Sequence, residues 1–167
     1  MREISVFGGT SHPALTAEIC AHLAVPQRPV ELKRFANDCL EVQLQSNCRE
    51  RDVFIIQSLV RPVQENLVEL LLMADAARGA SAARVTAVLP HYAYARSDKK
   101  DMPRISIGGR LIADLLVTSG VNRVQVQRQH PVDPGHHRLA TDVGRDIQNF
   151  GTWAWRAHAA PPDSGIA

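Results

Sequence analysis

Short apolar segments alternate with longer stretches of helical spacing along most of the chain. The short segments predict strands, because they are too brief for helices and are rich in β-branched residues. They lie at 4–7, 52–57, 84–89 and 121–126. The longer stretches predict helices that begin near Pro13, Val63 and Ile105. Strand and helix therefore alternate, as in an α/β protein.

Each predicted helix has start or stop signals and one apolar face. Ser11 is expected to cap the first helix, with Pro13 in its first turn. Gly79 and Gly120 end the second and third helices. The apolar faces are Leu15, Ile19 and Leu23 in the first helix, Leu67, Leu70, Leu71 and Ala74 in the second, and Leu111, Ile112, Leu115 and Leu116 in the third.

Two further segments, 30–35 and 40–44, alternate apolar and polar residues around the turn 36–38. This pattern predicts a half-exposed β-hairpin. With the hairpin in place, the order of elements predicts an α/β fold with a doubly wound, mostly parallel sheet. From residue 125 the pattern is lost. We therefore divide the chain into a domain over 1–124 and a divergent, poorly specified tail over 125–167.

Composition narrows the function classes. The net charge of +2 gives no general attraction to nucleic acid. No apolar run reaches the roughly 18 residues that a membrane helix needs, and the start turns polar at Gly8, too early for a signal peptide. We therefore expect a cytoplasmic protein without nucleic-acid or membrane partners. Cys20, Cys39 and Cys48 are expected to be reduced and buried.

The chemistry of the chain is concentrated in segment 90–104, which follows a predicted buried strand. It contains Tyr92, Tyr94, Arg96, Lys99, Lys100 and Arg104. Ligands of parallel sheets bind at the carboxyl ends of strands, and cations there favour an anion such as phosphate. The alternating tyrosines suit stacking on a planar base. The alternative interpretation is a solvated surface loop.

Two weaker signals have ordinary explanations. The turn Gly8-Gly9-Thr10-Ser11 ahead of a helix could hold a phosphate on its backbone N–H groups, but a plain tight turn is the better interpretation. The histidines His130, His136 and His137 have no zinc-binding spacing and are interpreted as incidental.

Several segments in unbroken register over about residues 3–124 resemble the amino-terminal half of ribose-phosphate pyrophosphokinase, the phosphoribosyl pyrophosphate synthetase family. They are 34–37, 52–58, 65–71, 80–88 and 92–100. The resemblance implies a phosphoribosyltransferase-like fold. It also implies transfer of the diphosphoryl group of ATP to the 1-hydroxyl of ribose 5-phosphate with Mg²⁺.

The resemblance assigns the nucleotide site to two segments of the chain. Phe35 and Asn37 would hold the adenine of an ATP bound across a subunit interface. On a mobile loop, the residues facing the nucleotide would be Arg96, Ser97, Asp98, Lys99, Lys100 and Asp101. His130 would lie near the magnesium ion. The expected partners are ATP and copies of this chain or full-length subunits.

The sequence also departs from the family pattern. Cys39 and Ser97 replace a usual glutamate and a common glutamine, and Arg128 replaces an acid near the metal. The second domain of the family is not recognisable, so ribose 5-phosphate would need a site on another domain or partner. We expect a truncated chain without synthetase activity of its own, and a reading-frame shift near codon 125 would explain the unpatterned tail.

Two other functions remain open at this level. The first is a non-catalytic nucleotide-binding or assembly subunit that joins full-length synthetases. The second is a fragment without function, which would fail to fold cooperatively.

Overall fold

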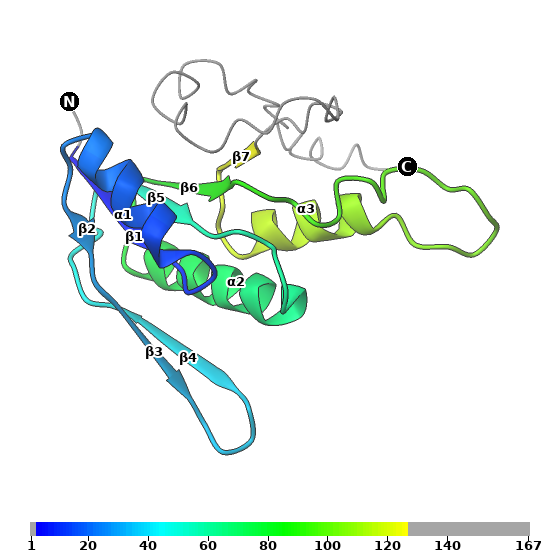
Figure 1. Cartoon of the computed structure of the whole chain (residues 1–167), viewed down its shortest axis with the longest axis horizontal. Coiled ribbons are helices and arrows are strands. Elements are labelled where there is room, and N and C mark those ends of the chain that lie inside the picture. Colours follow the sequence, from blue (N-terminus) through cyan, green and yellow to red (C-terminus); the bar gives the residue numbers. More distant parts are fainter. Residues whose placement is uncertain (1–2, 127–167) are drawn as a thin grey trace, which may run out of the picture.

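The computed structural model describes residues 3–126. The predictions for Arg128, for His130 and for residues 127–167 of the tail lie outside them, whereas residues 125 and 126 belong to the last strand. The strands are β1 (Ile4–Gly8), β2 (Gln27–Arg28), β3 (Val30–Arg34), β4 (Leu40–Leu44), β5 (Asp52–Ile56), β6 (Arg84–Leu89) and β7 (Arg123–Val126). The helices are α1 (Pro13–His22), α2 (Val63–Gly79) and α3 (Gly108–Thr118). Figure 1 shows these elements in sequence colours. None of the described helices is long and apolar enough to cross a bilayer.

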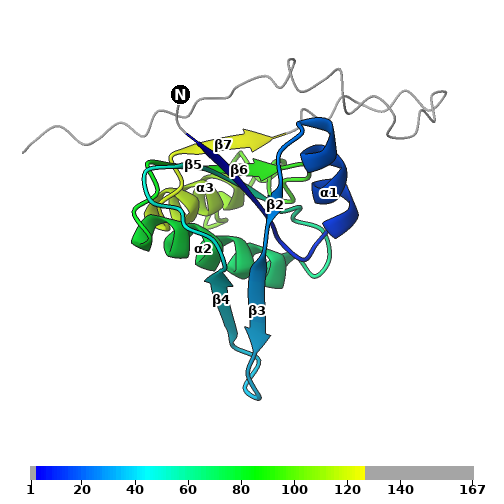
Figure 2. The same cartoon turned by 90° about the vertical axis from the view of Figure 1, so that its left-hand side faces the viewer.

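Five strands form one sheet in the order β2-β1-β5-β6-β7, and every neighbouring pair in it is parallel. The two remaining strands, β3 and β4, pair in antiparallel fashion and extend away from the sheet (Figures 1 and 2). The predicted α/β fold with a mostly parallel sheet and a hairpin is therefore confirmed. Strand β2 was not predicted, because two residues are too few to show an alternation.

The central strands are apolar throughout because both faces of the sheet are covered. In β1, Val6 packs with Cys20 of α1, whereas its neighbour Phe7 belongs to the larger core beneath α2 and α3. In β5, Ile55 belongs to the larger core beneath α2 and α3, and Ile56 packs with Val6 and Cys20 on the side of α1. Figure 2 shows α1 on one side of the sheet and α2 and α3 on the other.

The start and buried face of α1 differ from the prediction. His12, not Ser11, occupies the N-cap, and its Nδ1 accepts a hydrogen bond from the backbone N–H of Leu15 at 3.2 Å. Thr16 and Cys20 are the buried residues of this helix, and Leu23 is 45% exposed. The prediction missed this face because it assigned the inward positions to the largest apolar residues.

Helix α3 starts at Gly108 rather than near Ile105. Of its four predicted apolar contacts, Ile112 and Leu116 are buried, but Leu111 and Leu115 remain exposed. The apolar face of α3 is therefore wider than the part of the helix that packs against the core.

The three cysteines are free thiols, as predicted. Burial raises the pKa of Cys20 and of Cys48, opposed in Cys48 by the smaller effect of Arg51, so both are poor thiolates. Cys39 contradicts the expectation of burial, because it is exposed in the hairpin.

Candidate functional site

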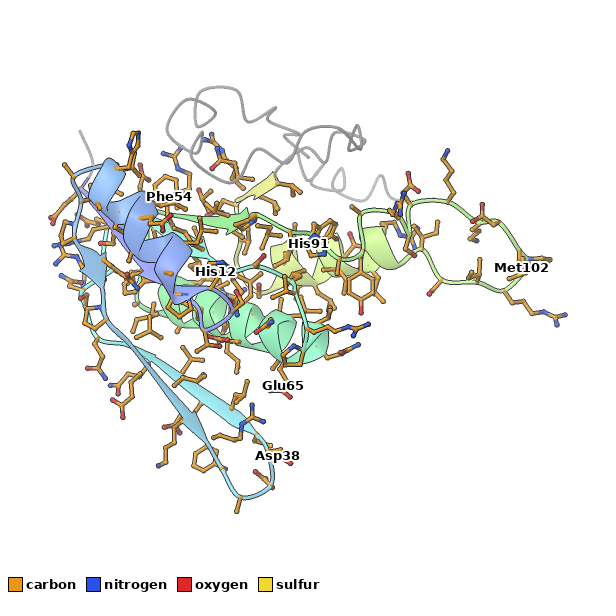
Figure 3. The ribbon with its side chains drawn as sticks, viewed as in Figure 1. His12, Asp38, Phe54, Glu65, His91 and Met102 are labelled. Atoms are coloured by element: carbon orange, nitrogen blue, oxygen red, sulfur yellow. The ribbon has the colours of Figure 1, made fainter. Side chains whose placement is uncertain are left out.

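The cationic segment forms a loop that extends from the end of β6 to the start of α3 and projects from the body of the protein, with Met102 at its far end (Figure 3). Arg96, Lys99, Lys100 and Arg104 are exposed. Within residues 3–126, none of these four side chains has an ion-pair or hydrogen-bond partner. Against Asp98 and Asp101 they leave the loop with a net charge of +2. Unpaired cations on an exposed loop are available to an anionic ligand.

Ser97 and two glycines form the base of this loop. The Ser97 hydroxyl accepts a hydrogen bond from the N–H of Gly108 at 3.1 Å, and its carbonyl accepts one from the N–H of Gly109 at 2.9 Å. A Cβ atom at Gly108 would lie 3.0 Å from the Ser97 hydroxyl, and one at Gly109 would lie 2.9 Å from the Tyr94 carbonyl oxygen. Glycine is therefore needed for this close approach.

The two tyrosines pack against the protein rather than forming an exposed stacking surface. Both are half-buried against the main core. The Tyr92 hydroxyl donates to the carbonyl of Gly109 at 2.7 Å. Burial, with a smaller effect of Tyr94, raises the pKa of Tyr92 to about 12. Tyr92 therefore has a structural role at the loop base, and stacking of the two rings on a base stays a prediction.

The hairpin tip carries the other predicted nucleotide residues. Phe35 is 39% exposed, and the Lys33 ammonium lies 5.0 Å from its ring centroid. Asn37 turns the chain, because its Oδ1 accepts from the N–H of Cys39 at 3.2 Å. Arg34 joins the hairpin to Glu65 of α2, and that hydrogen bond is the main cause that raises the pKa of Arg34.

The structure does not bring the hairpin tip and the cationic loop together within one chain. Asp38 marks the hairpin tip and Met102 the loop tip, and the two project from the body in different directions, downward and to the right in Figure 3. Within the described residues of one chain, the two segments therefore do not form a common site.

The turn after β1 is held by the protein's own side chains. The carboxylate of Glu69, which is only 2% exposed, accepts hydrogen bonds from the Thr10 N–H at 2.9 Å and the Thr10 hydroxyl at 2.6 Å. The Ser11 N–H and hydroxyl donate to Gln57 Oε1 at 3.2 and 2.7 Å, and the Gly9 N–H donates to the carbonyl of Ile56 at 2.9 Å. These N–H groups are thus engaged, and the interpretation as a tight turn is the one that fits.

Sequence reasoning missed this polar network. The available signal was a glutamate on the buried face of α2, beside Leu70 and Met73. Buried carboxylates need hydrogen-bond donors, so Glu69 predicts polar partners in the turn that packs on it. The same region lines a pocket of about 280 Å³ between the turn, α2 and the hairpin. It lies apart from the cationic loop, whose residues do not line it.

No group of three or more histidine, cysteine or acidic residues capable of holding a metal occurs within the described residues. The cationic loop does contain two carboxylates, Asp98 and Asp101. Magnesium commonly binds through one or two carboxylates together with substrate phosphates. Asp98 and Asp101 alone are too few to hold a metal, so they would bind Mg²⁺ only together with phosphate oxygens.

A parallel sheet with a cationic loop at the carboxyl end of an inner strand defines the class of α/β proteins that bind ligands at this edge. Residues 4–120 match the family described as the N-terminal domain of ribose phosphate pyrophosphokinase, and the chain belongs to this family. The resemblance that segments 34–37 to 92–100 carry is thus confirmed.

Individual relatives agree with this assignment. The chain is 67% identical over 130 residues to a Streptomyces coelicolor protein provisionally named ribose-phosphate pyrophosphokinase. The match covers 78% of this chain and 41% of the Streptomyces protein. It is 52% identical to the ribose-phosphate pyrophosphokinase of Deinococcus radiodurans over 168 positions, covering 96% and 52%. The crystal structure of phosphoribosylpyrophosphate synthetase from Mycobacterium smegmatis superposes with a TM-score of 0.75 at 36% identity, covering 89% and 46%. The chain spans about half the length of these relatives.

Proposed function

We propose that this chain binds the triphosphate of ATP, with Mg²⁺, as the nucleotide-side half of a ribose-phosphate pyrophosphokinase. The observation that carries the proposal is a set of four cationic side chains on the projecting loop that have no partner among residues 3–126: Arg96, Lys99, Lys100 and Arg104. Arginine and lysine bind phosphate oxygens through charge-assisted hydrogen bonds.

The full reaction would convert ATP and ribose 5-phosphate to phosphoribosyl pyrophosphate and AMP. Catalysis of phosphoryl transfer consists mainly of positioning and charge neutralisation. Arg96, Lys99 and Lys100 would neutralise the triphosphate, while Asp98 and Asp101 would share the Mg²⁺ ion with its oxygens. The ion would offset charge on the transferred group. Ribose 5-phosphate would bind only if a second domain or a partner subunit supplied its site.

Adenine would be held by a second chain. Phe35 and Asn37 belong to the turn between β3 and β4, whose tip at Asp38 lies away from the loop of the same chain (Figure 3). A copy of this chain, or a full-length subunit, would place its hairpin tip beside the loop, and the Phe35 ring would stack on the base. The proposed site is therefore complete only in an oligomer.

Titration calorimetry with Mg²⁺-ATP tests the proposal. We expect the wild-type chain to bind, and Arg96→Ala to weaken binding by about 10- to 100-fold, because a charge-assisted hydrogen bond contributes about 1.5–3 kcal/mol. Arg110→Ala is the matched control, since Arg110 is an exposed arginine on α3, just beyond the loop. AMP should bind more weakly than ATP. Absence of ATP binding, or equal affinity in the Arg96 variant, contradicts the proposal.

A second assay separates a catalytic chain from the alternative, a non-catalytic nucleotide-binding or assembly subunit. Formation of phosphoribosyl pyrophosphate is measured with the chain alone and after mixing with a full-length synthetase. Activity of the chain alone supports catalysis, whereas a change only in the mixture supports the assembly role.

A further inference from the structure

We infer that Ser97 is a positioning residue, which acts on nucleotide binding by fixing the base of the cationic loop rather than by touching the nucleotide. The inference about nucleotide binding rests on the proposed function. The inference about the loop base rests on the contacts of Ser97 alone.

Ser97 satisfies the first two backbone N–H groups of α3. The first turn of a helix has N–H groups without partners inside the helix, and a side chain at the N-cap commonly supplies one. Here the N-cap is Ile107, which makes no side-chain cap. The hydroxyl and carbonyl of Ser97 instead accept from Gly108 and Gly109 at 3.1 and 2.9 Å. The cap therefore comes from the opposite end of the loop.

These contacts close the loop on itself. Residue 97 touches residues 108 and 109, so the two ends of the intervening segment are held together. Tyr92 adds a second tie, through its hydroxyl to the carbonyl of Gly109 at 2.7 Å. A Cβ atom at Gly108 or Gly109 would have little room, which shows how closely the start of α3 approaches the chain segment at Tyr94 and Ser97.

Nothing else in residues 3–126 holds the tip. Residues 98–106 make no hydrogen bond or ion pair with the rest of the described chain. Met102 and Ile105 are 64% and 40% exposed, so apolar packing does not fix the tip either. The direction in which Arg96, Lys99 and Lys100 project is therefore set at the base. Loss of the Ser97 contact gives the loop more conformations. Restricting the loop to one of them on nucleotide binding then costs more entropy, which weakens binding.

The test compares Ser97→Ala with Ser97→Thr, which keeps the hydroxyl, and with Ser106→Ala as a matched control. Ser106 lies on the same loop, is exposed and makes no hydrogen bond within the described residues. Native-state hydrogen exchange of the Gly108 amide is followed by NMR without nucleotide, and Mg²⁺-ATP affinity is measured separately.

We expect Ser97→Ala to speed exchange at Gly108 by about fivefold, the usual consequence of losing one hydrogen bond. Ser97→Thr should restore slow exchange, and Ser106→Ala should not change it. The ATP dissociation constant should rise by a similar factor in Ser97→Ala only.

Three results overturn the inference. Unchanged exchange at Gly108 in Ser97→Ala would show that the loop base does not depend on the hydroxyl. Weaker ATP binding with unchanged exchange would show direct contact with the nucleotide. Faster exchange with unchanged ATP affinity would show a purely structural role. If the wild-type chain binds no ATP, the proposed function and the positioning role fail together, while the exchange data still decide whether Ser97 closes the loop.

Discussion

The side-chain amide of Gln57 donates a hydrogen bond to Oε2 of Glu69 at 2.8 Å, which joins the end of β5 to the buried face of α2. The oxygen of the same amide accepts a hydrogen bond from the Ser11 hydroxyl, so both the NH₂ group and the oxygen of Gln57 have partners. Glu69 in turn accepts from Thr10. Because donors converge on the carboxylate from two elements, only an acceptor with two equivalent oxygens satisfies all of them.

Glu69→Gln is expected to lower the free energy of unfolding by about 2 kcal/mol. One carboxylate oxygen becomes an NH₂ group, which either faces the NH₂ of Gln57 or displaces the Thr10 N–H. A buried donor is then left without an acceptor. Urea denaturation followed by circular dichroism measures the change. Glu65→Gln, one helical turn earlier on α2, is the control, because its side chain is 49% exposed. It should alter stability by less than about 1 kcal/mol, and equal losses in both variants would refute the role of the network.

Gly9→Ala is expected to destabilise the protein by about 2 kcal/mol or more, as overpacking of a tight site does. A Cβ at Gly9 would lie 2.3 Å from Gln57 Oε1, which cannot withdraw without leaving Ser11. Gly79→Ala gives the comparison, because nothing lies within 4 Å of its Cβ position at the end of α2. It should be neutral or stabilise by about 0.5 kcal/mol. Thermal denaturation of both variants measures this contrast, and a Gly9→Ala protein as stable as wild type would be inconsistent with the packing described.

The fold could be predicted from the sequence wherever burial was continuous. The runs 52–57 and 84–89 are apolar because both faces of each strand are covered, and the structure places β5 and β6 there. Prediction failed where small or polar residues face inward. Thr16 and Cys20 form the buried face of α1, whereas the larger side chain of Leu23 is 45% exposed.

The cationic loop was predictable in location, but its internal contacts were not, and its role as a binding site stays a prediction. Charge and position identified the loop with Arg96, Lys99 and Lys100 from residues alone. The role of Ser97 depends on a contact with Gly108, eleven residues later, and no local pattern encodes such a closure. The placement of Tyr92 depends equally on tertiary packing. Residue type predicts an anionic ligand, which stays a prediction, whereas the three-dimensional structure shows which residues hold the loop.

The wild-type protein is expected to lose stability at alkaline pH through ionisation of Tyr92, and Tyr92→Phe is expected to lack this contribution. Burial raises the pKa of Tyr92 from 10.0 to about 12, so the folded state keeps a proton that the unfolded state releases in this interval. The stabilisation from Tyr92 is therefore fully present below about pH 10 and is lost as the pH rises towards 12.

The measurement is the difference in unfolding free energy between the wild type and Tyr92→Phe across this pH range. Below about pH 10 the variant should be less stable by about 1 kcal/mol, because it lacks the hydrogen bond to Gly109. Above that pH the difference should shrink. Tyr94→Phe is the control: it removes only the smaller cause of the shift, so the alkaline decline should remain. A difference that stays constant with pH would show that the Tyr92 hydroxyl is not buried at the loop base.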